Sequence, residues 1–362
     1  MKIEEKIKLI MEVGEEVLTE EELKTLFETK KHPIAYDGFE PSGTSVHIAQ
    51  GLLRAININK MTKAGVKFTM LAADWHGWAN NKLDGDLEKI NIVGDYLIEV
   101  WKACDMDLDN VKFIRSTDLI NNGTYWKTVM QVARNNTVKR ITRCSQIMGR
   151  GENDSLQSSQ ILYPCMQCAD IFEIGADITQ LGMDQRKVNV LAREVGPKLG
   201  YYKPVVVSHH MLQGLSQPPG KDASHEERMM AMKMSKSKPD SAIFMNDIEA
   251  DINRKVKKAY CPEAQVQENP ILEYCKYIIF PKFEKSGSLI IERPEKWGGN
   301  LEFKTYAELE KAFAANELHP ADLKQAVAIY LNKLLEPVRK KLEKNKKAIK
   351  LAEQIKEFKV TR

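Results

Sequence analysis

The sequence has no apolar run long enough to cross a membrane. A bilayer-spanning helix needs about 20 consecutive apolar residues, and no run in the 362 residues approaches that length. The first residues mix glutamate with lysine and contain no uninterrupted apolar core, so we expect neither a secretory signal nor a transit peptide. These absences argue against membrane attachment.

Cysteine is scarce and irregularly spaced. The 6 cysteines are scattered, which argues against a disulfide framework and predicts a reducing, cytoplasmic compartment. Cys165 and Cys168 form a CxxC motif, but no second CxxC or histidine pair lies at zinc-site spacing, so we expect no metal site. On a helical wheel the two cysteines lie opposite a polar stripe, which favours packing residues and leaves a redox pair as the alternative.

Neither sign of charge dominates, and no internal repeat or low-complexity tract is evident. The net charge of +4 permits an RNA partner without indicating one. Hydrophobic residues make up 43% and charged residues 29% of the chain, as is ordinary for a soluble globular protein. The length suggests about two domains.

Strand-like and helix-like segments alternate along the first part of the chain. This alternation predicts an α/β fold with a parallel sheet and right-handed crossovers, in which ligands bind at the carboxyl ends of the strands. We expect Tyr36, Asp74, His76 and Gly182 at that edge. Residues 2–30 are predicted as two helices, and the pattern is helical from about Asp247 onward. Strands are predicted at residues 34–39, 67–74, 111–116, 174–181 and 203–208.

A polar stripe follows the Tyr163-Pro164 pair, which is typical of a helix start. At about 100° per residue, Tyr163, Gln167 and Asp170 fall on one face about 60° wide. Three polar side chains on one face, beside apolar neighbours, are not a core pattern. We interpret them as the floor of a polar pocket.

Two further segments are suited to phosphate chemistry. The turn EPSG at residues 40–43 precedes a helix that carries HIAQG at 47–51, and a helix N-terminus attracts anions. A lone histidine there is more often a cap than a ligand. The loop at residues 213–232 lacks periodicity and leads into KMSKS at 233–237. Its lysines can neutralise charge on a leaving phosphate group, although a solvated charge run is the alternative.

Together, EPSG, HIAQG and KMSKS resemble the signatures of class I aminoacyl-tRNA synthetases. YDGFEPSG, LAADWH, YPCMQCADI and GMDQRK resemble tyrosyl-tRNA synthetases of the archaeal and eukaryotic cytoplasmic type, from about residue 20 to about residue 340. The resemblance implies a Rossmann-like parallel-sheet catalytic domain at 1–245, with a helical insertion at about 117–160 and the KMSKS loop at about 213–240. An all-α anticodon-binding domain would follow at 246–362, and the protein would be a homodimer.

The implied activity is that of a tyrosine–tRNA ligase. L-Tyrosine would react with ATP to give tyrosyl-adenylate, and the tyrosyl group would pass to the 3′-terminal adenosine of tRNA(Tyr). Mg²⁺ would accompany the ATP phosphates, without any tightly bound cofactor. One alternative is a tryptophanyl-tRNA synthetase, against which Asp170 and Tyr36 argue because indole only donates. The other is a non-catalytic RNA-binding paralogue, against which His47 and KMSKS argue.

The resemblance assigns residues to each substrate. The tyrosine residues are Tyr36 and Asp170 at the phenol, Tyr163, Gln167 and Gln185 at the ammonium group, and Leu71, Ala73 and His76 along the wall. The ATP residues are Glu40, His47, Ala49, Gly182, Asp184, Lys233, Ser235 and Lys236, and the catalytic ones are His47, Gln50, Lys233 and Lys236. Ala49 and Gln50 depart from the family pattern, His-x-Gly-His.

The resemblance implies Trp297, His319 and Asp322 as tRNA residues, and the basic segments of the catalytic domain add Arg140, Arg143 and Arg186. Trp297 and His319 would sandwich a flipped base whose edge Asp322 reads, and the arginines would contact phosphates. Without the resemblance, Trp297 is expected in the core and His319 simply starts a helix. For the arginines, a solvated helix face is the alternative.

Overall fold

The computed structural model describes the chain except residues 44, 149–154, 221, 223–227, 229–230, 235–237, 284–286 and 359–362, and the side chain of residue 146. The chain divides into two compact units. Unit 1 comprises Met1–Thr44, Asn57–Met211 and Lys346–Arg362, and unit 2 comprises Ser45–Ile56 and Leu212–Asn345. Among the described residues, no helix combines the length and apolar character that a membrane span requires.

Unit 1 is built on a six-stranded sheet with the order β1-β6-β5-β2-β3-β4. The strands β2 to β6 pair in parallel, and β1 adds an antiparallel edge beside β6. All of β6 and nearly all of β3 are buried, as expected for central strands covered on both faces. The expected α/β parallel-sheet fold is therefore confirmed. The strand bounds are Gly14–Leu18 (β1), Ile34–Phe39 (β2), Lys67–Ala72 (β3), Val111–Arg115 (β4), Ile178–Thr179 (β5) and Val205–His209 (β6).

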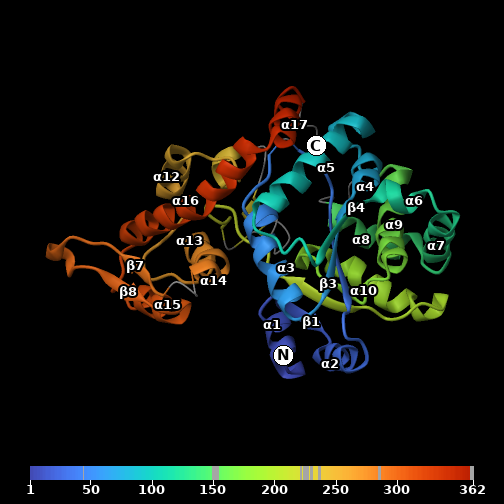
Figure 1. The fold of residues 1–362 in the computed structure, drawn as a ribbon, viewed down its shortest axis with the longest axis horizontal. Helices are drawn as coiled ribbons and strands as arrows, with labels where there is room; N and C mark the ends of the chain where they lie inside the picture. The colour runs from blue at the N-terminus through green and yellow to red at the C-terminus, as the bar shows by residue number, and fades with distance from the viewer. Residues whose placement is uncertain are drawn as a thin grey trace. The chain divides into compact units, whose positions relative to one another are not determined.

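Helices cover both faces of this sheet (Figure 1). Local capping determines several starts: the Thr19 side chain accepts the backbone N–H of Glu22, and Asp86 accepts those of Glu88 and Lys89. The helices are Ile3–Met11 (α1), Glu20–Thr29 (α2), Arg54–Lys63 (α3), Asp74–Ala79 (α4), Leu87–Ala103 (α5), Ser116–Ile120 (α6), Gly123–Arg134 (α7), Val138–Cys144 (α8), Ser158–Ile174 (α9) and Arg186–Val195 (α10). α3 begins in unit 2 and continues into unit 1.

Three local expectations are wrong. Gly14–Leu18 is strand β1, because pairing with β6 outweighs the helical spacing of its side chains. α9 starts at Ser158, so Pro164 lies inside the helix, and Gln157 and Gln160 form the capping box at its start. α9 runs to Ile174 and ends at Gly175, whose φ of 71° is left-handed, so only Ile178–Thr179 remains for β5.

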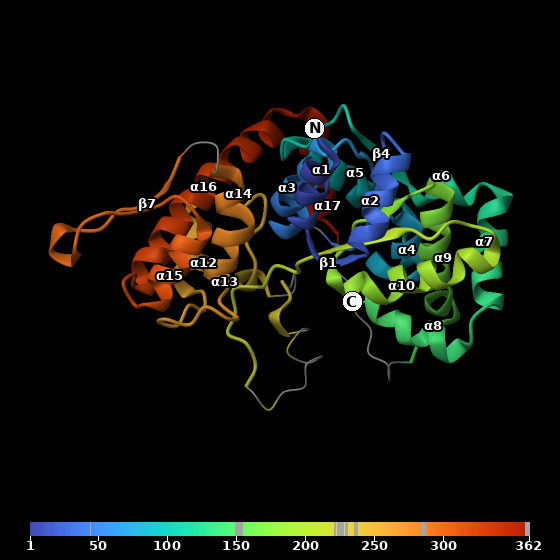
Figure 2. The same ribbon diagram turned by 90° about the horizontal axis from the view of Figure 1, so that it is seen from below.

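Unit 2 is helical, as expected, with a small hairpin added. The antiparallel strands Leu289–Ile291 (β7) and Leu301–Phe303 (β8) form a two-stranded sheet that the sequence pattern did not predict. The chain between them projects from the helices of this unit (Figure 2). The helices are Glu249–Lys258 (α12), Pro270–Tyr274 (α13), Phe280–Phe283 (α14), Tyr306–Ala314 (α15) and Pro320–Lys344 (α16).

The last helix, Lys346–Lys356 (α17), belongs to unit 1, where it packs on α5. Its Ile355 joins Leu83, Ile90 and Val93 in a small apolar cluster. The Lys347 ammonium lies 3.4 Å from the carboxylate of Glu99 on α5. The two compact units therefore have different boundaries from the two predicted domains. The functional division between residues 245 and 246 stays a prediction.

Candidate active site

The strand order of the unit 1 sheet reverses direction at β2, which lies between β3 and β5. After β2, the chain adds β3 and β4 on one side of it and then β5 and β6 on the other. Such a switch point leaves a crevice at the carboxyl ends of the strands. Glu40 directly follows β2, and Gly182 follows β5, so both lie at this point.

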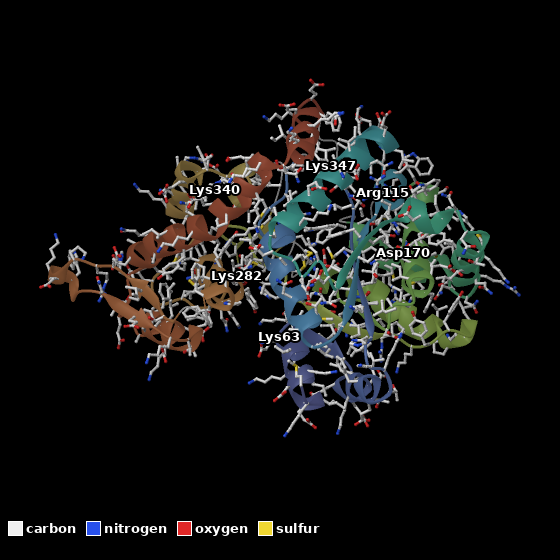
Figure 3. The ribbon with its side chains drawn as sticks, in the orientation of Figure 1. Lys63, Arg115, Asp170, Lys282, Lys340 and Lys347 are labelled. Carbon is white, nitrogen blue, oxygen red and sulfur yellow. The ribbon has the colours of Figure 1, made fainter. Side chains whose placement is uncertain are left out.

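Asp170 is the central polar side chain of the candidate site. It lies on α9 and is 1% exposed, and Figure 3 places it in the interior of unit 1. Its Oδ1 accepts a hydrogen bond from the Tyr125 hydroxyl at 3.0 Å. Its Oδ2 lies 3.1 Å from His76 Nε2, yet neither atom has a correctly oriented hydrogen bond within the described chain. One carboxylate oxygen thus keeps unused accepting capacity, which is costly in a buried site.

His76 connects this carboxylate to the end of β4. Its Nδ1 lies 3.2 Å from the Ser116 hydroxyl, and its ring meets the Tyr163 ring edge-on at 4.8 Å. Burial lowers the pKa of His76, but the Asp170 carboxylate, assisted by Glu40 and Asp74, raises it by more, so the net shift is upward. The imidazole therefore carries more positive charge near neutrality than an ordinary histidine.

Two buried tyrosines near Asp170 remain neutral. Burial and the nearby Asp170 carboxylate raise the pKa of Tyr36, which lies within β2 and is 1% exposed. Burial and Glu40 likewise raise the pKa of Tyr163. Both phenols therefore keep their protons and can donate hydrogen bonds at physiological pH.

Several polar side chains contact Glu40. Its Oε2 accepts from the Tyr163 hydroxyl at 3.2 Å and from the Asn80 amide at 3.0 Å. Its Oε1 lies 3.6 Å from the Lys82 ammonium. Gln160 donates to the Asn80 carbonyl at 3.3 Å. Glu40, which the sequence assigned to ATP, is therefore joined directly to a residue assigned to tyrosine.

The structure brings Gln167 and Gln185 together as well. The Gln167 amide donates to the Gln185 side-chain carbonyl at 3.2 Å, and the Gln185 amide donates to the Ile147 backbone carbonyl at 3.1 Å. Leu71 and Ala73 are buried in the same core cluster as Tyr36 and Tyr163. The eight residues assigned to tyrosine all lie in unit 1.

Gly182 follows β5 in a crowded turn. A Cβ atom there would lie 2.4 Å from the Met211 sulfur and 2.6 Å from Asp184 Oδ1. A Cβ atom there would therefore force the ends of these two side chains to move. Asp184 is half-buried beside it.

The HIAQG segment lies in unit 2. Ile48 N–H donates to the Ile243 carbonyl and Met245 N–H donates to the Val46 carbonyl, each at 2.8 Å. His47 Nδ1 accepts the Gln50 N–H at 3.3 Å, next to the start of the π-helical turn Ala49–Leu53. Ala49 and Gln50 are partly exposed.

The KMSKS loop also belongs to unit 2. Lys233 is half-buried, and Gly214 N–H closes the loop by donating to the Met232 carbonyl at 2.6 Å. Ser235 and Lys236 lie outside the described residues. The residues assigned to ATP therefore come from both units.

The arginines assigned to tRNA lie at the surface of unit 1. Arg140 pairs with Glu194 at 2.8 Å and Arg186 pairs with Glu16 at 2.7 Å. Arg143 is exposed on α8. A solvated helix face remains compatible with this geometry, and phosphate contact stays a prediction.

Trp297 is 66% exposed on the β7–β8 connection, so the expectation that it is a core residue without the resemblance is wrong. The Arg293 guanidinium donates to the Gly299 carbonyl at 3.0 Å and the Glu317 carbonyl at 3.2 Å. It thereby ties the turn that holds Trp297 to the segment before His319.

His319 caps α16, because its Nδ1 accepts the Ala321 N–H at 3.1 Å. Its Nε2 lies 3.3 Å from Glu263 Oε1. Asp322 is half-buried in the first turn of the same helix.

The sequence did not reveal Tyr125, the donor to Asp170. Tyr125, Val129 and Val132 are all buried on α7, and their i, i+4, i+7 spacing marks an apolar face. A tyrosine on such a face needs a buried partner for its hydroxyl, which is the signal that could have identified it.

Cys165 and Cys168 are free thiols packed in the core, as the packing interpretation predicted. Burial raises the pKa of Cys165 to about 12, which disfavours thiolate chemistry. Within the described residues, no group of three His, Cys, Asp or Glu side chains could hold a metal ion.

Comparisons with known proteins bear on this geometry. The family described as tRNA synthetases class I (W and Y) matches residues 28–336. Tyrosine–tRNA ligase 1, cytoplasmic, of Arabidopsis thaliana is 51% identical, over 99% of this chain and 90% of its own. The tyrosine–tRNA ligase of Thermococcus kodakarensis is 42% identical, over 98% and 99%.

Solved structures agree with these relatives. The tyrosyl-tRNA synthetase of Pyrococcus horikoshii, crystallised with L-tyrosine, has a TM-score of 0.90 and 40% identity, over 98% of this chain and 100% of that one. The tryptophanyl-tRNA synthetase of Plasmodium falciparum reaches a TM-score of 0.68 at 16% identity, over 96% and 92%, and so shares the fold alone. The chain therefore belongs to the class I tRNA synthetases of the tryptophan and tyrosine group, and within it to the tyrosyl-tRNA synthetases.

Proposed function

We propose that the pocket around Asp170 selects L-tyrosine, which the enzyme activates with ATP and transfers to tRNA(Tyr). In the first step the tyrosine carboxylate attacks the α-phosphorus of ATP, giving tyrosyl-adenylate and pyrophosphate. In the second, a ribose hydroxyl of the 3′-terminal adenosine takes the tyrosyl group and AMP leaves. The buried accepting oxygen of Asp170 is the observation that carries this proposal.

A phenol matches the two groups at the bottom of the pocket. Its hydroxyl donates to the Asp170 carboxylate and accepts from the neutral Tyr36 hydroxyl. Phenylalanine would leave Asp170 Oδ2 and the Tyr36 hydroxyl without the hydrogen bonds that the phenol supplies, at a cost of about 1–3 kcal/mol for each. Tryptophan offers a single N–H donor, so the Tyr36 hydroxyl would lose its acceptor.

The ammonium group of tyrosine fits the oxygens on the neighbouring helix face. Tyr163, Gln167 and Gln185 offer hydroxyl and amide oxygens, and Glu40, bonded to the Tyr163 hydroxyl, adds negative charge. Leu71 and Ala73 give the ring an apolar wall. This arrangement supports binding of a free amino acid with the phenol innermost.

Catalysis requires positioning and charge stabilisation rather than a covalent nucleophile. Asp184, beside the crowded Gly182 turn, would bond the ATP ribose. His47, Gln50, Lys233 and Lys236 would meet the phosphates, where the lysines neutralise the leaving pyrophosphate. Mg²⁺ would enter as part of the ATP substrate, with ligands from the phosphates.

The exposed indole of Trp297 supports recognition of an unpaired tRNA base by stacking. His319 would cover the other face of the base, and Asp322 would accept hydrogen bonds from its edge. Arg140 and Arg186 sit in surface ion pairs, each worth about 0–1 kcal/mol. Phosphates of the acceptor stem can displace such weak partners.

An exposed aromatic group on unit 1 supports a homodimer. Trp78 is 45% exposed, Trp126 37% and Met130 60%. Trp75 packs against both indoles, with centroids 5.2 and 6.2 Å apart. Large exposed apolar groups mark interaction surfaces, and a second copy of the chain would cover this one. A cytoplasmic location is proposed by analogy with the Arabidopsis relative, which is named cytoplasmic.

ATP–pyrophosphate exchange tests the proposal. Exchange is expected with tyrosine and not with tryptophan or phenylalanine, followed by tyrosylation of tRNA(Tyr). Exchange with tryptophan would indicate a tryptophanyl-tRNA synthetase instead. Failure to exchange with any amino acid would indicate an RNA-binding protein without catalysis. Sedimentation of the wild-type protein and of the Trp126→Glu variant measures their oligomeric states. The wild type is expected to be a dimer, and the variant is expected to dimerise less.

A further inference from the structure

Residues 242–247, called the connector below, follow the KMSKS loop directly and also touch the HIAQG segment. The Ile243 carbonyl accepts from Ile48 N–H, and Met245 N–H donates to the Val46 carbonyl, each at 2.8 Å. These two bonds flank His47, which itself forms a β-bridge with Phe244. A shift of the connector therefore also shifts the backbone around His47, which is assigned to the ATP phosphates.

Lys255 on α12 holds the connector at both ends. Its ammonium donates to the Ala242 carbonyl at 3.0 Å and to Asp247 Oδ2 at 2.6 Å. It also lies 4.6 Å from the centroid of the Phe244 ring, in cation–π contact. One cation thus binds the first residue, the last residue and the middle of the connector.

The pairing is internal to unit 2 and nearly dry. The Lys255 side chain is 3% exposed and that of Asp247 11%. Asp247 Oδ2 also accepts from Phe244 N–H at 2.9 Å, and the Asp247 carbonyl accepts from Arg339 of α16 at 2.8 Å. A buried lysine is costly unless it is paired and hydrogen-bonded, and an apolar side chain would fill the space more cheaply. Lys255 is therefore better explained by the geometry that it imposes than by packing.

We propose that Lys255, through Asp247 and Ala242, is a positioning residue for adenylate formation. It keeps His47, and the end of the KMSKS loop from which the connector continues, in register with the phosphates of bound ATP. The residues assigned to tyrosine lie in unit 1 and make none of the contacts described for Lys255. The inference rests on the proposed function. It predicts that a change at Lys255 impairs the ATP-dependent step and leaves tyrosine binding intact.

The test compares Lys255→Met with Lys257→Met, a control on the same helix whose side chain is exposed. Pyrophosphate exchange gives kcat and KM for each substrate, and equilibrium tyrosine binding counts the folded molecules. Because small misplacements can cost about 10²-fold in rate, Lys255→Met is expected to lose about that factor in kcat/KM for ATP per folded molecule. The dissociation constant for tyrosine should change by less than about twofold, because the variant loses only interactions that position ATP. Lys257→Met should match the wild type.

Two further variants keep the result interpretable. Asp247→Asn removes the partner's charge without changing its shape, so it should show the same ATP-specific loss even if Lys255→Met does not fold. Lys255→Arg preserves the cation and should recover part of the activity. Normal kcat/KM for ATP in folded Lys255→Met or Asp247→Asn would overturn this inference alone. A wild-type protein without tyrosine-dependent exchange would instead overturn the proposed function.

Discussion

Replacing Asp170 by asparagine isolates the charge that is proposed to read the phenol. The change keeps the shape of the side chain and removes the negative charge 3.1 Å from His76 Nε2. The Tyr125 hydroxyl, 3.0 Å from Oδ1, can still donate to an amide oxygen. The fold around α9 should therefore survive, and the effect should appear mainly in substrate selection.

The expected size follows from the hydrogen bond that is weakened. A hydrogen bond to a charged group contributes about 1.5–3 kcal/mol, and each 1.36 kcal/mol is about tenfold in rate. The kcat/KM for tyrosine should therefore fall about 10- to 150-fold. Phenylalanine has no hydroxyl to lose, and a neutral amide is cheaper than a carboxylate to bury unpaired. Its kcat/KM should stay the same or rise, so discrimination between the two amino acids should fall.

The assay is ATP–pyrophosphate exchange with each amino acid, with KM for ATP as an internal check. Tyr125→Phe serves as the matched control, because it removes the other partner of the carboxylate without touching its charge. That control should lower the free energy of unfolding by about 1–3 kcal/mol and lose less selectivity than Asp170→Asn. An unchanged ratio of tyrosine to phenylalanine activity in Asp170→Asn would refute the assignment of the phenol to Asp170.

Three further predictions concern other parts of the chain. The pKa of His76 is raised in the folded protein, so protonation of His76 stabilises the fold. This contribution should be complete below the ordinary pKa of about 6.5 and lost as pH rises through the raised value. In urea unfolding, the free energy of unfolding of His76→Gln should therefore differ most from that of the wild type at acidic pH, and a difference that does not change with pH would contradict this. Ile355 is 2% exposed in α17, so Ile355→Ala should cost about 2–5 kcal/mol in denaturant unfolding, and a cost near zero would mean that α17 does not dock. Trp297→Ala should weaken tRNA(Tyr) charging through KM by about 1–3 kcal/mol with pyrophosphate exchange intact; equal losses in both would count against base stacking.

The sequence predicted best what depends on neighbours in the chain. The face shared by Tyr163, Gln167 and Asp170 follows from helical spacing, and these residues do lie together on α9. The alternation of strands and helices likewise predicted the parallel sheet. The start of α9 was missed because Pro164 looks like a first-turn residue, although core packing carries the helix through it.

The motifs, the parallel sheet and the chemistry available at Asp170 can be predicted from the sequence, because helix period, strand period and side-chain type are local properties. Which distant groups meet is seen only in the folded chain: Tyr125 donates to Asp170, 45 positions away, and α17 returns to pack on α5 in unit 1. The burial of Lys255 against the connector is likewise seen only there. These contacts depend on how faces far apart in the chain bury one another, and no periodicity in a single segment encodes its partner.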